Sequence, residues 1–224
     1  MIVLYHGSDK IIERPIFGFG KRHNDYGLGF YCTENPELAK EWSCKGSNTG
    51  YVNKYGLDDS DLNILNLNSD DYSILHWITI LLENRHFDTS SVVASTSKKY
   101  LIEHFHIDLS GYDVVKGYRA DDSYFLYAQD FISGALPLSR LKDAMRLGNL
   151  GEQIVLKSEK AFDSIEFQGY EKTDYPEYSK KRENREDSAK RAYHRIRSAG
   201  MSLDEITVLD IVRGTVKEDD PRLF

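Results

Sequence analysis

Residues 26–42 read Tyr-Gly-Leu-Gly-Phe-Tyr-Cys-Thr-Glu-Asn-Pro-Glu-Leu-Ala-Lys-Glu-Trp. This order predicts a loop loosened by glycine, a short strand over 30–32 and then a helix that reaches Trp42. Three residues typical of helix starts mark the beginning of that helix. They are Thr33 or Asn35 as the cap and Pro36 in the first turn.

Two aromatic side chains, Tyr31 and Trp42, are expected on these adjoining elements, eleven residues apart. Rings that face each other across a gap about one ring thick bind a planar ligand by stacking. The alternative is that both rings fill the core, as large aromatics commonly do. The stretch therefore predicts either a stacking site or an ordinary packed strand and helix.

The composition describes an ordinary soluble protein. The chain has 224 residues, of which 40% are hydrophobic and 29% charged, enough to bury a sizeable core. It begins without a basic, apolar signal segment and holds no membrane-length apolar run, so we expect a cytoplasmic protein without a membrane partner. Cys32 and Cys44 fit neither a disulfide framework nor a metal-ligand spacing, so no metal is expected.

The net charge is −7, so the overall field does not attract nucleic acid and any such contact would be local. Residues 180–197 differ, with eight Lys or Arg against three acids. A charged helix is predicted over 179–199, because its only apolar stripe recurs at helical spacing. We expect residues 176–224 to form a helical extension that serves recognition. A solvated helix docked on the domain is the alternative.

The remaining pattern mixes strands and helices. Strands are expected over 2–5, 51–57, 62–67, 113–118, from 152 to 156, and over 161–168, the last two paired with each other. Helices are expected over 71–84, 97–105, 123–132 and 138–147. Three local signals are typical of helix ends: Ser95-Thr96-Ser97 as an N-cap, Gly148 as a C-cap, and Ser202 with Glu205 as a capping box.

Three short motifs follow one another along the chain. The first strand ends in His6-Gly7-Ser8, the Gly-x-Gly-Phe-Tyr31 strand is followed by Trp42, and Glu152 begins an apolar strand. In this order they resemble the His-Tyr-Glu class of ADP-ribosyltransferases, the group of diphtheria toxin and the poly(ADP-ribose) polymerases. They also resemble its small bacterial members, which are toxins of toxin–antitoxin operons.

The resemblance implies an α+β ADP-ribosyltransferase fold, in which two small antiparallel sheets pack together with flanking helices. It spans residues 4–168, so a catalytic domain is expected over 1–175 and a charged helical C-terminal extension over 176–224. It implies NAD⁺ as co-substrate, transfer of ADP-ribose to a macromolecular acceptor and an antitoxin as a further partner. Protein, DNA and RNA remain open as acceptors.

The resemblance also implies roles for single residues. His6 would contact the adenosine ribose, Gly7 and Ser8 would hold the nicotinamide carboxamide, and Tyr31 and Trp42 would enclose the nicotinamide ring. Glu152 would bind the 2′-hydroxyl of the nicotinamide ribose and stabilise the positive charge that develops there.

The acceptor side is less defined. Arg119, Asp121 and Gln153 are its candidates, and a capped helix start with a surface arginine is the alternative for the first two. Position 154 is Ile, so the Glu-x-Glu pair of the other large transferase class is missing and arginine side chains are not expected as acceptors. An NAD⁺ glycohydrolase and a non-catalytic NAD⁺ or ADP-ribose binding module remain the alternative functions.

Overall fold

The computed structural model describes residues 1–44, 49–120, 122–147, 152–200, 202 and 204–224, the side chains of 122–124 and 144–147 excepted. The chain forms two compact units. The first contains residues 1–66, 108–119 and 150–185, and the second contains residues 67–107, 120–149 and 186–224.

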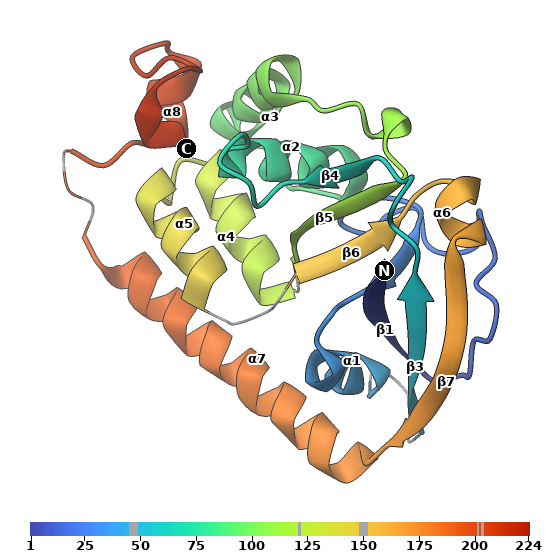
Figure 1. Ribbon diagram of the computed structural model, residues 1–224. Helices are drawn as coiled ribbons and strands as arrows, with labels where there is room; N and C mark the ends of the chain where they lie inside the picture. The colour runs from blue at the N-terminus through green and yellow to red at the C-terminus, as the bar shows by residue number, and fades with distance from the viewer. Residues whose placement is uncertain (45–48, 121, 148–151, 201, 203) are drawn as a thin grey trace. The chain divides into compact units, whose positions relative to one another are not determined.

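The first unit holds both sheets. One is antiparallel, in the order β1 (Ile2–Ser8), β3 (Gly50–Leu57) and β7 (Ile165–Thr173) (Figure 1). The other has the order β2 (Phe30–Cys32), β6 (Glu152–Leu156), β5 (Val114–Tyr118) and β4 (Ile64–Asn66). In it β2, β6 and β5 are antiparallel, and β4 runs parallel to β5.

A shared hydrophobic core packs these two sheets against each other. Its buried residues come from β1 and β3 on one side and from β2, β5 and β6 on the other. They are Leu4, Tyr55 and Leu57, then Cys32, Val114, Ile154 and Leu156. A backbone bridge between Tyr5 and Thr33 also links β1 to the end of β2. These features confirm a mixed α+β class with two small packed sheets.

Helix α1 (Pro36–Ser43) packs on β1 and β3. The Asn35 side chain caps it by accepting hydrogen bonds from the next two free backbone N–H groups, which confirms the predicted start. Gly7 makes the close packing on β1 feasible, because a Cβ there would overlap the carbonyl oxygen of Ala39 and lie 2.7 Å from the Ser43 nitrogen. The unit also contains η1 (Leu109–Gly111), α6 (Glu159–Asp163) and the first turns of α7 (Tyr175–Ser198).

The second unit is helical in its described part. It contains α2 (Ile74–Asn84), α3 (Val92–Phe105), α4 (Asp122–Ile132), α5 (Leu138–Leu147), the later turns of α7, α8 (Val208–Val212) and η2 (Pro221–Leu223). Helix α3 packs on α2, α4 and α8, and α4 packs on α5. Within the described residues, no helix combines the length and apolarity that a membrane span requires.

Three expectations about the strands are wrong. Residues 159–163 are helical, because Ser158 caps α6 and Ala161 is buried in the core. The strand that follows, β7, pairs with β3 rather than with β6. The β4–β5 pair is parallel, so the second sheet is not wholly antiparallel.

Two helix caps also differ from the prediction. Helix α3 begins after Ser91, whose hydroxyl accepts a hydrogen bond from the Ala94 nitrogen, so Ser95-Thr96-Ser97 lies inside the helix. The last helix, α8, is capped by Thr207 and Asp210, and the Ser202–Glu205 contact closes only a turn. The predicted C-cap Gly148 lies outside the described residues.

Candidate functional site

The candidate residues gather where several strands of the first unit end. Glu152 is the first residue of β6, opposite Tyr118, the last residue of β5. The strand β2 ends beside the same end of β6, and the Tyr5–Thr33 bridge links the middle of β1 to it. Glu152 and Arg119 therefore lie at one edge of the second sheet, whereas the His6 ring stacks on Phe30, which pairs with Leu156 at the other end of β6.

Glu152 is held by an ion pair at that edge. Its carboxylate lies 2.8 Å from the Lys116 ammonium, and its side chain remains 43% exposed. A second carboxylate, that of Glu34, lies 3.1 Å from the same ammonium. The hydrogen bond to Glu152, supported by that to Glu34, raises the pKa of Lys116, so the lysine is a permanent cation between two acids.

His6 is fixed by the backbone of β2. Its Nδ1 lies 2.7 Å from the Tyr31 carbonyl oxygen, and because a carbonyl only accepts, Nδ1 carries the proton. Burial lowers the pKa of the ring, which favours the neutral form with Nε2 as an acceptor. The ring also stacks on Phe30, with centroids 4.4 Å apart. The imidazole is therefore fixed in place, with Nε2 as the ring's acceptor.

Tyr31 is bound to the glycine-containing loop before it. Its hydroxyl donates to the Gly27 carbonyl oxygen at 2.5 Å and accepts from the Tyr26 nitrogen at 3.1 Å. Gly27 has a φ of 72°, a value that glycine adopts without strain. Tyr31 pairs with Val155, so alternation along β6 places it on the sheet face opposite Glu152.

The same loop has further anchors. The Lys157 ammonium donates to the Tyr26 and Leu28 carbonyl oxygens at 2.5 and 2.7 Å, and burial lowers its pKa. The Tyr26 hydroxyl donates to the Tyr118 carbonyl oxygen at 2.6 Å. The loop that precedes Tyr31 is thus tied to Tyr118, the last residue of β5, and to Lys157, which follows β6, and is preorganised.

Trp42 carries a planar cation on its ring. The Arg119 guanidinium carbon lies 4.9 Å from the indole centroid, which is a cation–π contact. The Trp42 Nε1 is buried and has no hydrogen-bond partner among the described residues. Because a buried, unsatisfied donor is costly, this indole offers both a stacking face and an N–H to a ligand.

Other predicted residues are placed differently. Gly7 faces α1, as described above, and Ser8 is half-buried at the end of β1, where its hydroxyl donates to the Asp9 carboxylate at 3.4 Å. Gln153 is buried and donates to the Asp25 carboxylate at 3.1 Å. It lies on the face opposite Glu152, so the structure does not bring these two together. Asp121 lies outside the described residues.

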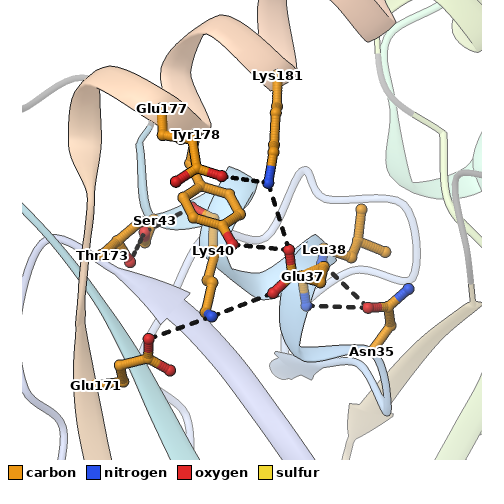
Figure 2. Close-up of polar contacts among 10 residues, drawn as sticks. All are labelled: Asn35, Glu37, Leu38, Lys40, Ser43, Glu171, Thr173, Glu177, Tyr178 and Lys181. Atoms are coloured by element: carbon orange, nitrogen blue, oxygen red, sulfur yellow. Dashed lines mark hydrogen bonds and ion pairs between the residues drawn. The ribbon is translucent and has the colours of Figure 1, made fainter.

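Helix α1, which carries Trp42, is held from outside by the start of α7. Figure 2 shows Glu37 of α1 accepting a hydrogen bond from the Tyr178 hydroxyl at 2.7 Å and lying 3.1 Å from Lys40 and 3.6 Å from Lys181. The Tyr178 bond is the main reason that the pKa of Glu37 is lowered. Lys40 also pairs with Glu171 of β7 at 3.2 Å.

Two arginines of α7 extend this contact to the end of α1. The Arg185 Nε donates to the Glu41 carboxylate at 2.7 Å, and Arg182 donates to the Cys44 carbonyl oxygen at 3.2 Å. Glu41 is the immediate neighbour of Trp42. The start of α7 therefore helps to fix the position of the indole.

Sequence reasoning missed Glu34, Lys116 and Lys157 as members of the site. Glu34 follows Tyr31 by three residues and Lys116 precedes Arg119 by three, but only the strand order β2-β6-β5 brings them to Glu152. In the described part of the chain, no group of three or more His, Cys, Asp or Glu residues is arranged to hold a metal ion.

Taken together, the edge offers a half-exposed carboxylate and, beside it, an indole face that binds a planar cation, while the neutral imidazole lies toward the other end of β6. These groups suit a ligand with hydroxyls, a flat cationic ring and a centre at which positive charge develops. No curated protein and no solved structure matches the chain. A family model with the description "Protein of unknown function (DUF3990)" matches residues 2–167, and the chain belongs to that family.

Proposed function

We propose that this protein is an NAD⁺-dependent mono-ADP-ribosyltransferase, which transfers ADP-ribose to a macromolecular acceptor and releases nicotinamide. The observation that carries the proposal is the placement of Glu152. Its carboxylate is 43% exposed and is held by Lys116. Near the same edge of the sheet, the Trp42 ring already binds a planar cation, the Arg119 guanidinium. Oxidised nicotinamide is itself a flat cation, so it suits this ring face.

The chemistry assigns a separate task to each side chain. Trp42 binds the nicotinamide ring, and its N–H meets a polar group of the ligand. His6 accepts a hydrogen bond from a ribose hydroxyl through Nε2. When the bond between C1′ and the nicotinamide nitrogen breaks, its electron pair neutralises the ring and leaves positive charge on the ribose. Glu152 stabilises that charge, as carboxylates do in glycoside hydrolysis.

Release of nicotinamide from NAD⁺ tests the proposal. Glu152→Gln keeps the shape of the side chain but removes its charge, so we expect kcat to fall by about 10²–10³-fold with little change in NAD⁺ affinity. Glu166→Gln, which changes an exposed glutamate of β7, is the matched control and should behave like the parent. A parent protein that binds NAD⁺ without turnover would be a binding module. Turnover to free ADP-ribose with every acceptor tried would indicate a glycohydrolase.

The resemblance to toxins of toxin–antitoxin operons supports a proposal about the cellular role. We propose that the protein is a bacterial toxin that acts in the cytoplasm and is held inactive by an antitoxin. Induced expression of the parent in a bacterial host should then arrest growth, and Glu152→Gln at equal expression should not. Equal growth arrest by both proteins would show that toxicity does not depend on the transferase activity.

A further inference from the structure

A second carboxylate lies beside Glu152, although the sequence between Glu152 and Ile154 shows no acidic pair. Glu34 and Glu152 lie 3.1 and 2.8 Å from the same Lys116 nitrogen. In the β2–β6 register, Phe30 pairs with Leu156 and Cys32 with Ile154. Continuing that register by two residues places Glu34 opposite Glu152 on the same face. The paired acid missing from β6 is thus supplied by the end of β2.

Fold stability does not explain this pair. Two like charges directly opposite each other in a sheet are destabilising. The ion pairs that offset the repulsion are solvent-accessible, with side chains 29% exposed in Lys116 and 48% in Glu34, and such pairs contribute little. Glu34 also precedes the cap of α1, where a negative charge is favourable, but that role needs no contact with Lys116. The triad therefore suggests a chemical use.

We propose that Glu34 is the general base that takes the proton of the incoming acceptor, while Glu152 serves the ribose. This proposal rests on the proposed function. In the step, an O–H or N–H group of the acceptor forms the new bond to C1′ with its lone pair, and its proton passes to the Glu34 carboxylate. The bond to nicotinamide breaks with its electrons on the nicotinamide nitrogen. Lys116 lies between the two carboxylates and offsets their mutual repulsion.

The arrangement also selects a class of acceptor. A neutral hydroxyl or N–H group has both a lone pair and a proton to give and is not repelled by two carboxylates. A carboxylate or phosphate acceptor has no such proton at neutral pH and would be repelled. We therefore infer that the acceptor atom belongs to an O–H or N–H group rather than to an acidic side chain or a phosphate.

Turnover of NAD⁺ with water as the acceptor tests the role of Glu34, because water must also lose a proton. Glu34→Ala should lower kcat by about 10²-fold, while the Kd for NAD⁺ stays within about twofold. Added formate should restore part of the lost rate in a concentration-dependent way, because a small carboxylate can occupy the vacated space and accept the proton. Glu34→Gln should show the same loss, and Glu166→Ala should show none.

Each outcome is decisive. Parental turnover in Glu34→Ala would overturn the inference and leave the proposed function intact. A loss of kcat that formate does not restore, or a weaker NAD⁺ affinity, would show that Glu34 only holds Lys116 in place. Absence of NAD⁺ turnover in the parent, both with water and with cell lysate as a source of acceptors, would refute the proposed function itself. Circular dichroism should show all variants folded, because Glu34 is half-exposed.

Discussion

The contact between Arg185 and Glu41 predicts how firmly the start of α7 holds α1. The Arg185 Nε lies 2.7 Å from the Glu41 carboxylate, and the two side chains are only 16% and 15% exposed. Exposed pairs are worth about 0.2–1 kcal/mol, and removing one member of a fully buried pair costs about 3–5 kcal/mol. Because these side chains are mostly covered, we expect Arg185→Met to lower the free energy of unfolding by about 2–3 kcal/mol.

A double-mutant cycle separates the pair from the packing of its side chains. Glu41→Gln should cost a similar amount, and the double variant should cost less than the sum, with a coupling of about 1.5–2 kcal/mol. Urea unfolding followed by tryptophan fluorescence is the measurement, because Trp42 is the neighbour of Glu41 and reports on this helix. Effects that add to within about 0.5 kcal/mol would refute the reasoning. In that case the contact would contribute no specific stabilisation.

Three further predictions follow from single contacts. Trp42→Ala should weaken NAD⁺ binding by about 1–2 kcal/mol in a titration while Trp42→Tyr largely keeps it, and unchanged affinity in Trp42→Ala would assign the ring to the core. Gly7→Ala should lower the melting temperature, because the new Cβ would lie 2.7 Å from the Ser43 nitrogen of α1, and an unchanged melting temperature would contradict the close packing. Arg140→Met should destabilise the second unit by about 2–3 kcal/mol at neutral pH, because Arg140 binds Glu205 through two 3.0 Å contacts. Hydrogen bonds from the Ser202 nitrogen and from Arg140 lower the pKa of Glu205. The stability that the ionised Glu205 contributes is therefore fully present above its unfolded-state pKa of about 4.3 and is lost as the pH falls further. In denaturant melts, the loss of unfolding free energy caused by Arg140→Met should accordingly shrink toward pH 3.

Local patterns predicted the elements better than their pairing. The sequence correctly placed β2, the start of α1, with Asn35 as one of its two candidate caps, and the apolar strand that starts at Glu152, because each depends on a few neighbouring residues. It did not predict that β7 pairs with β3 or that β4 runs parallel to β5. Strand partners far apart in sequence are chosen by the shared core, and no local signal encodes that choice.

The composition change at residue 176 marks a change of charge rather than a change of packing. The first turns of α7, through residue 185, belong to the first unit, because Tyr178, Arg182 and Arg185 bind α1. Composition alone predicts a charged helix, but it does not predict which of the charged side chains form ion pairs or hydrogen bonds. Removal of residues 176–224 should therefore weaken the first unit as well as any recognition surface on the later turns.

Some motif residues are required by the fold itself, and others are not. Gly7 is required by the approach of α1, Gly27 by its positive φ, and the Tyr31 hydroxyl by the loop that it closes. These residues would be needed in a protein of this fold whether or not it bound NAD⁺. Glu152 and the Trp42 indole N–H have no comparable packing role, because one is half-exposed and the other lacks a hydrogen-bond partner in the described part of the chain. The proposed catalysis therefore requires these two side chains, together with the second carboxylate, Glu34, that the strand order brings to Glu152.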